Sequence, residues 1–312
     1  TTVLLIGPMT VTVCRLLDVD PFPFFLAEIM ASNIGGTATL IGDPPNIMIG
    51  SAAGLTFADF IMFDAPAAII CLVAMIAIFY VLFGRKFKVA DDRKKALMEL
   101  DEREEIKNPT LLRQSVVMIL LVTAGFMLHG SLGIESCVVA LTAAGVLMLV
   151  SGERIEDALM HVEWTTLVFF AGLFIIVGSL SEVGVIGMLA QALVDVTGGS
   201  TFTAMIVLLV ASAVVSSFLD NIPFVATMIP ILLSMEATGM DVAPLWWAVS
   251  LGACLGGNGT LIGASANVVM SDIAKKNGTS ITFANFMKYG FPIMLVTIAI
   301  SAVYLIVRFP PM

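Results

Sequence analysis

Two polar stretches interrupt this otherwise apolar sequence, and they share a short sequence motif. The first runs from Ser32 to Asn46 and the second from Gly256 to Asn267; both contain Thr-Leu-Ile-Gly and end on an Asn. A bilayer helix opens in this way only where its freed N–H and C=O groups are buried in protein or line a polar cavity, because lipid cannot hydrogen-bond them. We therefore expect two breaks in membrane helices, and matched breaks in two halves indicate a binding site for a transported ion or molecule.

An opened helix offers two chemical tools. Free N–H groups at a half-helix N-terminus favour anions, and free carbonyls at a C-terminal end suit cations such as Na⁺. Polar side chains and close-approach glycines complete such sites. The candidates for substrate or ion binding are Asn33, Gly36, Thr37, Thr39, Gly42, Asp43 and Asn46 in the first copy, Asp220 and Asn221 between the copies, and Asn258, Gly259, Thr260, Ser265 and Asn267 in the second. The alternative is that the small residues only permit close helix packing.

Three acidic residues are predicted to lie at membrane depth, where an ionisable group is costly and indicates function. Asp220 is the strongest candidate for proton coupling, and Glu28 and Asp43 are the others. The second copy has no acid in its break, since Ala264 stands where Asp43 stands in the first. A structural alternative remains for each: Asp220 caps the following helix, and Glu28 and Asp43 cap a helix or form a salt link.

Composition identifies an integral membrane protein. Hydrophobic residues make up 59% of the 312 residues and charged residues only 12%, which is too apolar for a soluble domain. Nucleic acid is not an expected partner. The four cysteines are far apart and are expected to be buried apolar side chains, and the solitary His129 and His161 are not expected to take part in chemistry. No resident metal or other cofactor is expected apart from Na⁺ or H⁺ as a coupling ion.

The elements that must position the polar residues are helices of two kinds. Half-helices are expected around the breaks, at 22–34 and 47–53 and at 246–255 and 268–274; longer apolar spans are expected at 61–83, 115–128, 134–150, 164–180 and from 281 to about 307. Residues 202–217 and the return to 233 are each too short to cross roughly 30 Å of hydrocarbon, so they are predicted to form a re-entrant hairpin with its tip at Asp220 and Asn221. Residues 182–196 are amphipathic and are expected to lie along the interface.

The repeat predicts how the chain is divided. The parts are 1–84, the first-repeat transport part with its closing span; 85–113, a charged, helical cytoplasmic linker; 114–181, the scaffold spans of the second repeat; and 182–312, the second-repeat hairpin, broken helix and final span. Pro66 matches Pro292 and Phe57 matches Phe283 in this register. The first copy then lacks about a hundred upstream residues, including a first hairpin tip.

Charge supports an inverted arrangement of the two halves. When the linker is placed in the cytoplasm and crossings are counted, every Lys and Arg except Arg308 falls on the cytoplasmic side, in accord with the positive-inside rule. The two hairpins then enter from opposite sides. Fold class is thus an all-α polytopic membrane protein with inverted repeats, re-entrant hairpins and two discontinuous helices, the first repeat being incomplete.

These strings resemble the ion transporter superfamily, in the branch that holds arsenite permeases, NhaD-type sodium/proton antiporters and the melanosomal P protein, with its citrate-transporter-like domain. The segments that carry the resemblance are residues 1–5, 32–46, 217–224 and 251–269. The resemblance implies a scaffold domain, an elevator-like transport domain and a homodimer. Relatives with Ser-Asn-Thr at the hairpin tips hold Na⁺ and a carboxylate there. Asp220-Asn221-Ile222 departs from this pattern, which argues against a dicarboxylate and favours direct binding of H⁺ or Na⁺.

The expected function is secondary active transport of a small inorganic ion or anion coupled to Na⁺ or H⁺, in a prokaryotic inner membrane with the linker in the cytoplasm. The expected partners are the small-ion substrate, the lipid bilayer and a second copy of the chain. An anion channel or a sodium/proton antiporter on the same scaffold is the alternative. An intramembrane enzyme is disfavoured, because the sequence has no His-Glu-x-x-His motif and no Ser or Cys with an evident base.

Overall fold

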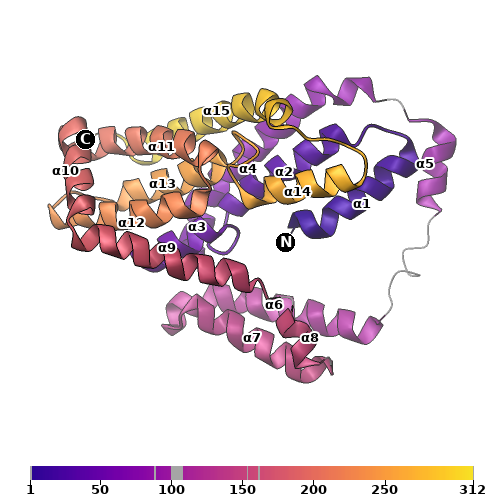
Figure 1. Cartoon of the computed structure of the whole chain (residues 1–312), viewed down its shortest axis with the longest axis horizontal. Coiled ribbons are helices and arrows are strands. Elements are labelled where there is room, and N and C mark those ends of the chain that lie inside the picture. Colours follow the sequence, from indigo (N-terminus) through magenta and orange to yellow (C-terminus); the bar gives the residue numbers. More distant parts are fainter. Residues whose placement is uncertain (1, 88, 100–107, 153, 161, 312) are drawn as a thin grey trace.

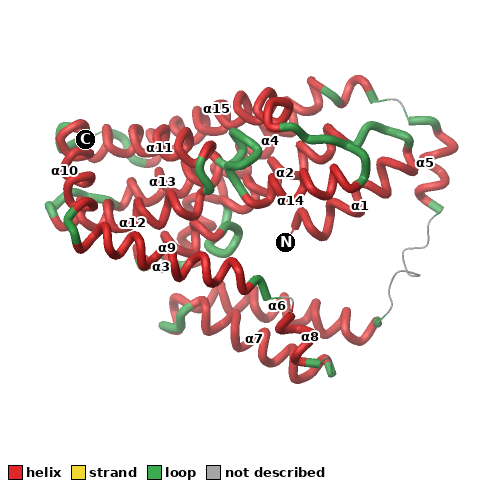
Figure 2. The backbone as a smooth tube through the Cα atoms, in the orientation of Figure 1, coloured by secondary structure: helices red, strands yellow, loops and turns green. Residues whose placement is uncertain are grey.

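A computed structural model describes residues 2–87, 89–99, 108–152, 154–160 and 162–311, and these contain helices and no strand (Figures 1 and 2). The α-helices are α1 Thr2–Leu17, α2 Phe22–Thr37, α3 Pro44–Ala53, α4 Phe57–Leu82, α5 Asp91–Met98, α6 Pro109–Leu132, α7 Ser136–Ser151, α8 Ile155–Met160, α9 Trp164–Glu182, α10 Val185–Thr197, α11 Thr201–Phe218, α12 Asn221–Ala237, α13 Ala243–Gly256, α14 Ser265–Lys276 and α15 Phe283–Arg308, with a 3₁₀ helix, η1, at Gly84–Lys86.

The predicted all-α, polytopic membrane architecture is confirmed. Five described helices, α4, α6, α9, α11 and α15, are long and apolar enough to cross a bilayer. Large apolar side chains on their outer faces are exposed, as on α6, where Phe126 is the only described buried residue. Such surfaces are stable in lipid and not in water. The chain is an all-helical integral membrane protein.

Helix α13 is the centre of the packing, and every residue from Pro244 to Gly256 is buried. It contacts α2, α3, α4, α11, α12 and α15, so it touches both halves of the chain. The backbones of α13 and α11 are in direct contact. A Cβ on Gly252 would lie 2.6 Å from the carbonyl oxygen of Leu209, and a Cβ on Gly256 would lie 2.7 Å from the carbonyl oxygen of Ala213. Small residues allow this close approach in a membrane protein.

Both expected helix breaks are present, although each is shorter than the polar string that predicts it. Helix α2 continues through Thr37 instead of ending at Ile34, and α3 begins at Pro44. Proline fits the first turn of a helix, where its missing N–H is not needed, so the prolines begin α3 and do not extend the break. In the second copy the non-helical residues are 257–264.

Each break folds back on itself at a pair of glycines. A Cβ on Gly42 would collide with the carbonyl oxygen of Gly36. At the equivalent positions of the second copy, a Cβ on Gly263 would lie 2.9 Å from the carbonyl oxygen of Gly257. The two breaks therefore share a close backbone crossing that only glycine permits. The inverted relation of the two halves, which this likeness supports, stays a prediction.

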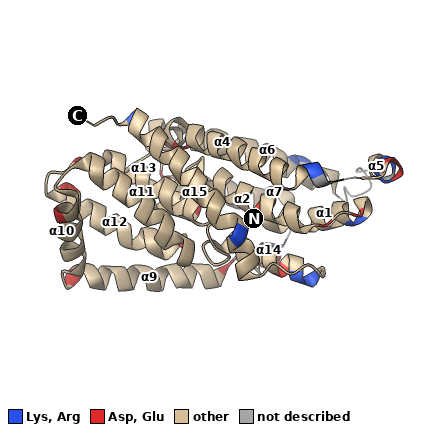
Figure 3. Ribbon diagram, turned by 90° about the horizontal axis from the view of Figure 1, so that it is seen from above, with Lys and Arg blue, Asp and Glu red and all other residues tan. Residues whose placement is uncertain are grey.

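The loop between α11 and α12 lies at Leu219–Asp220, at the predicted hairpin tip. Helix α11 has 18 residues and belongs to the membrane-length helices, so it is longer than the arm expected from the sequence. The re-entrant course of this pair stays a prediction. Helix α10 lies across one end of the bundle in both views, while the long helices run along it (Figures 1 and 3).

The charged linker is helical at α5, where Arg93 forms an ion pair of 3.1 Å with Asp18 beside α1. Residues 100–107 of the predicted linker lie outside the described residues. Its last residues belong instead to the membrane-length helix α6, because Asn108 caps that helix by accepting from the Leu111 N–H and Pro109 follows in its first turn. Lys and Arg gather toward the α5 end of the molecule (Figure 3).

Helices α6, α7 and α8 form a group at the side of the bundle (Figure 1). His129 of α6 joins this group to α4: its Nε2 accepts from the Phe57 N–H at 3.2 Å, and its Nδ1 lies 3.1 Å from the Ile134 carbonyl oxygen, to which it donates. This histidine is a structural link between the two groups of helices. His161 lies outside the described residues.

Substitution of Gly42 tests the backbone crossing. We expect Gly42→Ala to lower the free energy of unfolding by about 1–3 kcal/mol, since the added methyl group must displace the backbone at Gly36. Gly35→Ala is the matched control, because a Cβ at Gly35 meets nothing within 4 Å. Thermal unfolding in detergent measures both variants, and equal midpoints would contradict the crossing.

Candidate functional site

A cavity of about 710 Å³ lies where the two breaks meet the α11–α12 loop. Its wall includes the first turns of α3 and α14, the tip residues Asn221 and Ile222, and Glu163 at the start of α9. Segments more than two hundred residues apart in the sequence thus contribute to one polar chamber. We call it the junction cavity.

Six of the residues predicted from the sequence line the junction cavity, and they come from both breaks and the tip. They are Asn33, Thr39, Gly42, Asp43, Asn221 and Ser265. Seven others are buried behind the wall: Gly36, Thr37, Asn46, Asn258, Gly259, Thr260 and Asn267. Asp220 is partly buried beside the cavity and is not among the lining residues.

Asp43 is the N-cap of α3 and joins the first break to the tip. Its Oδ2 accepts a hydrogen bond of 3.0 Å from Nδ2 of Asn221, across 178 residues of sequence. Asp220 Oδ1 accepts from the Ile222 N–H at 3.0 Å, so Asp220 caps α12, as the structural alternative expects. The tip thus presents Asn221 to the first break while Asp220 holds the start of the helix.

Two asparagines satisfy the opened backbone of the breaks. Asn46 Nδ2 donates to the carbonyl oxygens of Thr37 and Thr39, at 3.1 and 3.0 Å. Asn267 Nδ2 donates to those of Gly257 and Thr260, at 2.7 and 2.9 Å. The amides thus replace helical hydrogen bonds that the break removes, as buried backbone carbonyls require.

The breaks are also joined to each other. Asn33 Nδ2 lies 2.9 Å from both Asn258 Oδ1 and Asn267 Oδ1, and donates to each. Thr260 Oγ1 donates to the carbonyl oxygen of Ser217, the residue before the α11 terminus. Nδ2 of Asn258 is buried without a hydrogen-bond partner. The second break is therefore bonded to α2 on one side and to the tip region on the other.

Several polar residues of this region were missed from the sequence. Asp64 of α4 and Ser250 of α13 are fully buried, and Ser250 Oγ lies 2.8 Å from Asn46 Oδ1 and 2.5 Å from Asp64 Oδ2. Cys254 is buried as expected, but its Sγ also donates to Asn46 Oδ1, at 3.3 Å. The signal for Asp64 was available: it is an acid inside a long apolar span, and such residues indicate function.

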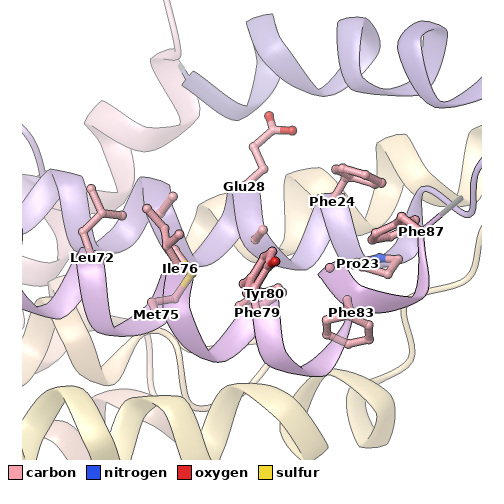
Figure 4. Close-up of a pocket in the computed structure, with 13 residues that line it drawn as sticks. Pro23, Phe24, Glu28, Leu72, Met75, Ile76, Phe79, Tyr80, Phe83 and Phe87 are labelled. Carbon is pink, nitrogen blue, oxygen red and sulfur yellow. The ribbon is translucent and has the colours of Figure 1, made fainter. Parts of the chain in front are cut away.

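Glu28 lies apart from the junction cavity, in a separate apolar pocket of about 470 Å³ formed with α4 (Figure 4). Its carboxyl group points away from the aromatic side chains of Tyr80, Phe83 and Phe87. Oε2 accepts from Thr10 Oγ1 of α1, at 2.9 Å, while Oε1 is buried without a partner. The structure does not group Glu28 with Asp43 and Asp220, and its part in proton coupling stays a prediction.

The junction cavity is acidic. Asp43 and Glu163 are in its wall, and the described lining residues include no Lys, Arg or His. Within the described part of the chain, no three His, Cys, Asp or Glu side chains are placed to hold a metal ion. Oxygen atoms from carboxylates, amides and hydroxyls suit H⁺ or Na⁺, and the first turn of α14, which has no acid, favours an anionic group.

Fold and site together define a class: a polytopic helical membrane protein whose polar cavity lies between two interrupted helices. Comparison with known families agrees, because the sequence profile described as citrate transporter matches residues 1–252. The chain belongs to this family of membrane transporters.

Curated relatives are similar over almost the whole chain. An uncharacterised transporter of Mycobacterium bovis is 47% identical over 313 residues, covering 99% of this chain and 72% of its own length. The 46 kDa membrane protein of Mycobacterium leprae is 45% identical over 99% of this chain and 73% of its own length. The P protein of Mus musculus is 33% identical over 98% of this chain and 46% of its own length. The resemblance to the ion transporter superfamily is thus confirmed.

The amide of Asn46 can be tested by a near-isosteric change. Asn46→Asp replaces the donor by an acceptor, so the carbonyls of Thr37 and Thr39 lose the amide donor and Thr39 keeps only the Gly42 N–H. A buried group left unpaired costs about 1–3 kcal/mol. We expect a clearly lower unfolding midpoint in detergent. Asn285→Asp is the control, because Asn285 is exposed and its counterpart in the first half is Asp59 of the Thr56 capping box. Equal midpoints for the two variants would show that Asn46 does not hold the break.

Proposed function

We propose that this protein is a secondary active transporter that moves a small inorganic ion or anion through the junction cavity, coupled to H⁺ or Na⁺. The observation that carries the proposal is the meeting of two helix breaks and a helix–loop–helix tip around one acidic cavity. Sites of this kind, formed by discontinuous helices, suit alternating access because both halves contribute to one ligand. Membership of a transporter family supports the same reading.

The coupling cation would bind on the Asp43 side of the cavity. Asp43, Asn33 and Thr39 provide carboxylate, amide and hydroxyl oxygen atoms there. Cations of low charge and protons match such ligands, and an unpaired buried carboxylate is costly without one. Asp220, beside the tip, is a second carboxylate that can take up a proton.

An anionic substrate would bind on the opposite side, at the first turn of α14. Ser265 is exposed and Ala264, its N-cap, offers no competing carboxylate. A bare polyanion is disfavoured, because Asp43 and Glu163 repel it and no described lining residue is basic. We expect any anion to travel together with neutralising cations or protons.

During alternating access, the bundle that holds the cavity would move relative to a scaffold formed by α6 and α7. The protein would act as a homodimer in the bacterial inner membrane. Helix α7 has no described buried residue and α6 only Phe126, as expected for a scaffold that faces lipid or a second copy. The contact between this part and the bundle is small and passes through α4. An elevator-like displacement would break few contacts there.

A sodium/proton antiporter is the second candidate, and the acidic cavity without basic residues favours it. Transport of Na⁺ against H⁺ requires only one carboxylate site that each ion occupies in turn. A channel for anions finds less support, since carboxylates line the cavity. Saturation of the flux separates a carrier from a channel.

Proteoliposomes test the proposal directly. Internal pH is followed while gradients of NaCl, LiCl, arsenite or citrate are imposed. We expect at least one gradient to drive proton flux, and Asp43→Asn and Asp220→Asn each to lower it by about tenfold or more, equivalent to 1.4 kcal/mol. Asn caps a helix as well as Asp does, so Asp220→Asn tests the carboxylate itself and not the cap.

Asp272→Asn is the control, because Asp272 is exposed on α14 outside the cavity wall. Its flux should equal that of the wild type. Unsaturable anion flux without proton movement would overturn the carrier and support the channel.

A further inference from the structure

Asp64 of α4 is a buried carboxyl group that the proposed cavity does not use. Its exposed fraction is 0%, Oδ1 has no hydrogen-bond partner, and Oδ2 lies 2.5 Å from Ser250 Oγ. Ser250 Oγ lies 2.8 Å from Asn46 Oδ1 as well. Three oxygen atoms of α3, α4 and α13 are thus in a row directly behind the first break.

The orientation of Asn46 fixes which of its atoms faces Ser250. Carbonyl oxygens only accept, so the atom of Asn46 that faces Thr37 and Thr39 must be the NH₂ nitrogen. Its oxygen then faces Ser250. Since this oxygen also only accepts, the contact of 2.8 Å requires the Ser250 hydroxyl proton.

Ser250 has one hydroxyl proton and two acceptors to serve. When that proton is donated to Asn46, the contact of 2.5 Å with Asp64 needs a second proton, which the carboxyl group alone can supply. If Asp64 were ionised, the single Ser250 proton could serve only one of the two oxygens. The other, on Asn46 or on Asp64, would then face a lone pair of the Ser250 oxygen with no proton between them. The geometry is satisfied when Asp64 is a neutral carboxylic acid.

No positive charge offsets an ionised Asp64. Asp64 lies close enough for its charge to act on the Cys254 thiol of α13 and the Tyr304 hydroxyl of α15, and neither of these groups is cationic. The titratable groups on other packed elements are engaged elsewhere or exposed. Glu28 of α2 binds Thr10, His129 of α6 binds Phe57, and Arg308 of α15 stacks on the Phe63 ring at 4.6 Å. The cations Arg85 of η1, Arg113 of α6 and Lys288 of α15 are exposed. Among described residues Asp64 forms no ion pair.

The repeat shows that the architecture does not need an acid here. In the register that aligns Phe57 with Phe283 and Pro66 with Pro292, Gly290 matches Asp64. A Cβ at Gly290 would collide with the carbonyl oxygen of Asn258 in the second break. In the second half, the backbone of the break packs directly against Gly290. In the first half, the carboxyl group of Asp64 occupies the equivalent position.

We propose that Asp64 is a proton-carrying residue, protonated in this conformation, whose proton loss turns the Ser250 hydroxyl from Asn46 to Asp64 and so loosens the first break. The role of Asp64 in coupling rests on the proposed coupled transport. Its protonation in this conformation does not. On release the carboxyl O–H bond breaks, its electron pair stays on Asp64, and the proton passes to water that enters the site. Asn46 Oδ1 then keeps only the weak Cys254 thiol donor.

Infrared spectroscopy of the purified protein in detergent tests the protonation without any transport assay. We expect the wild type at neutral pH to show a protonated-carboxyl band that Asp64→Asn removes. Ser250→Ala should keep this band and move it to the higher frequency of a carboxyl group that donates no hydrogen bond. Asp59→Asn is the control and should change nothing, because the second half has Asn285 at that position. If Asp64→Asn does not fold, Asp64→Glu should shift the same band.

A spectrum in which Asp64→Asn removes no band, or in which Ser250→Ala shifts none, would overturn the assignment of the proton. The coupling is tested by proton flux in proteoliposomes under NaCl or citrate gradients, which should fall by about tenfold in Asp64→Asn. An unchanged proton flux in that variant would overturn the role of Asp64 in coupling. The protonation of Asp64 would still be tested separately by the infrared band. If the wild type moves no proton under any gradient, the proposed function fails independently of the band.

Discussion

A helix interrupted inside a bilayer must have its freed backbone groups satisfied by the protein, and the structure depends on how this is done. Two asparagines, Asn46 and Asn267, donate to the carbonyls of the first and second break. Glycine pairs let each break cross its own backbone. Since lipid offers no replacement donor, the amides and glycines together permit a polar cavity at this depth. The rest of the bundle, centred on α13, surrounds these two crossings.

The same hydrogen bonds make the two breaks one mechanical unit. Asn33 ties α2 to the second break, Ser250 ties α13 to the first, and Asn221 brings the tip to Asp43. A cation at Asp43 would therefore act on the hydrogen bond to the tip, and a proton lost from Asp64 would act on the hydrogen bond between Ser250 and Asn46. Coupling between sites requires a contiguous element with two arrangements, and the Ser250 hydroxyl, with two acceptors and one proton, is such an element.

Sequence alone predicted the helical membrane fold and the place of both breaks, because glycine, proline and asparagine in apolar runs have few explanations in a bilayer. It did not predict which side chains face the cavity. Asn46 and Asn267 were predicted to bind ions, and nothing in the sequence indicated that their amides donate to the backbone of the breaks, because it does not give the rotation of a half-helix. Asp64 was overlooked although an acid inside a long apolar span is a signal in itself; only its partners, Ser250 and Asn46, required the three-dimensional structure. Glu28 was predicted to be a proton-coupling candidate beside Asp220 and Asp43, and it lies in a separate pocket, where Thr10 of α1 donates to it.

In the proposed function, residues of both breaks form one ligand site. Hydrogen exchange read by mass spectrometry, on the purified protein with NaCl or citrate added and with choline chloride as the reference, tests it most directly. We expect slower exchange in residues 38–43 and 257–264 together, at the same ligand concentration, with α6 and α7 unchanged. Protection of only one break, or of neither while the protein transports the same ligand, would contradict it.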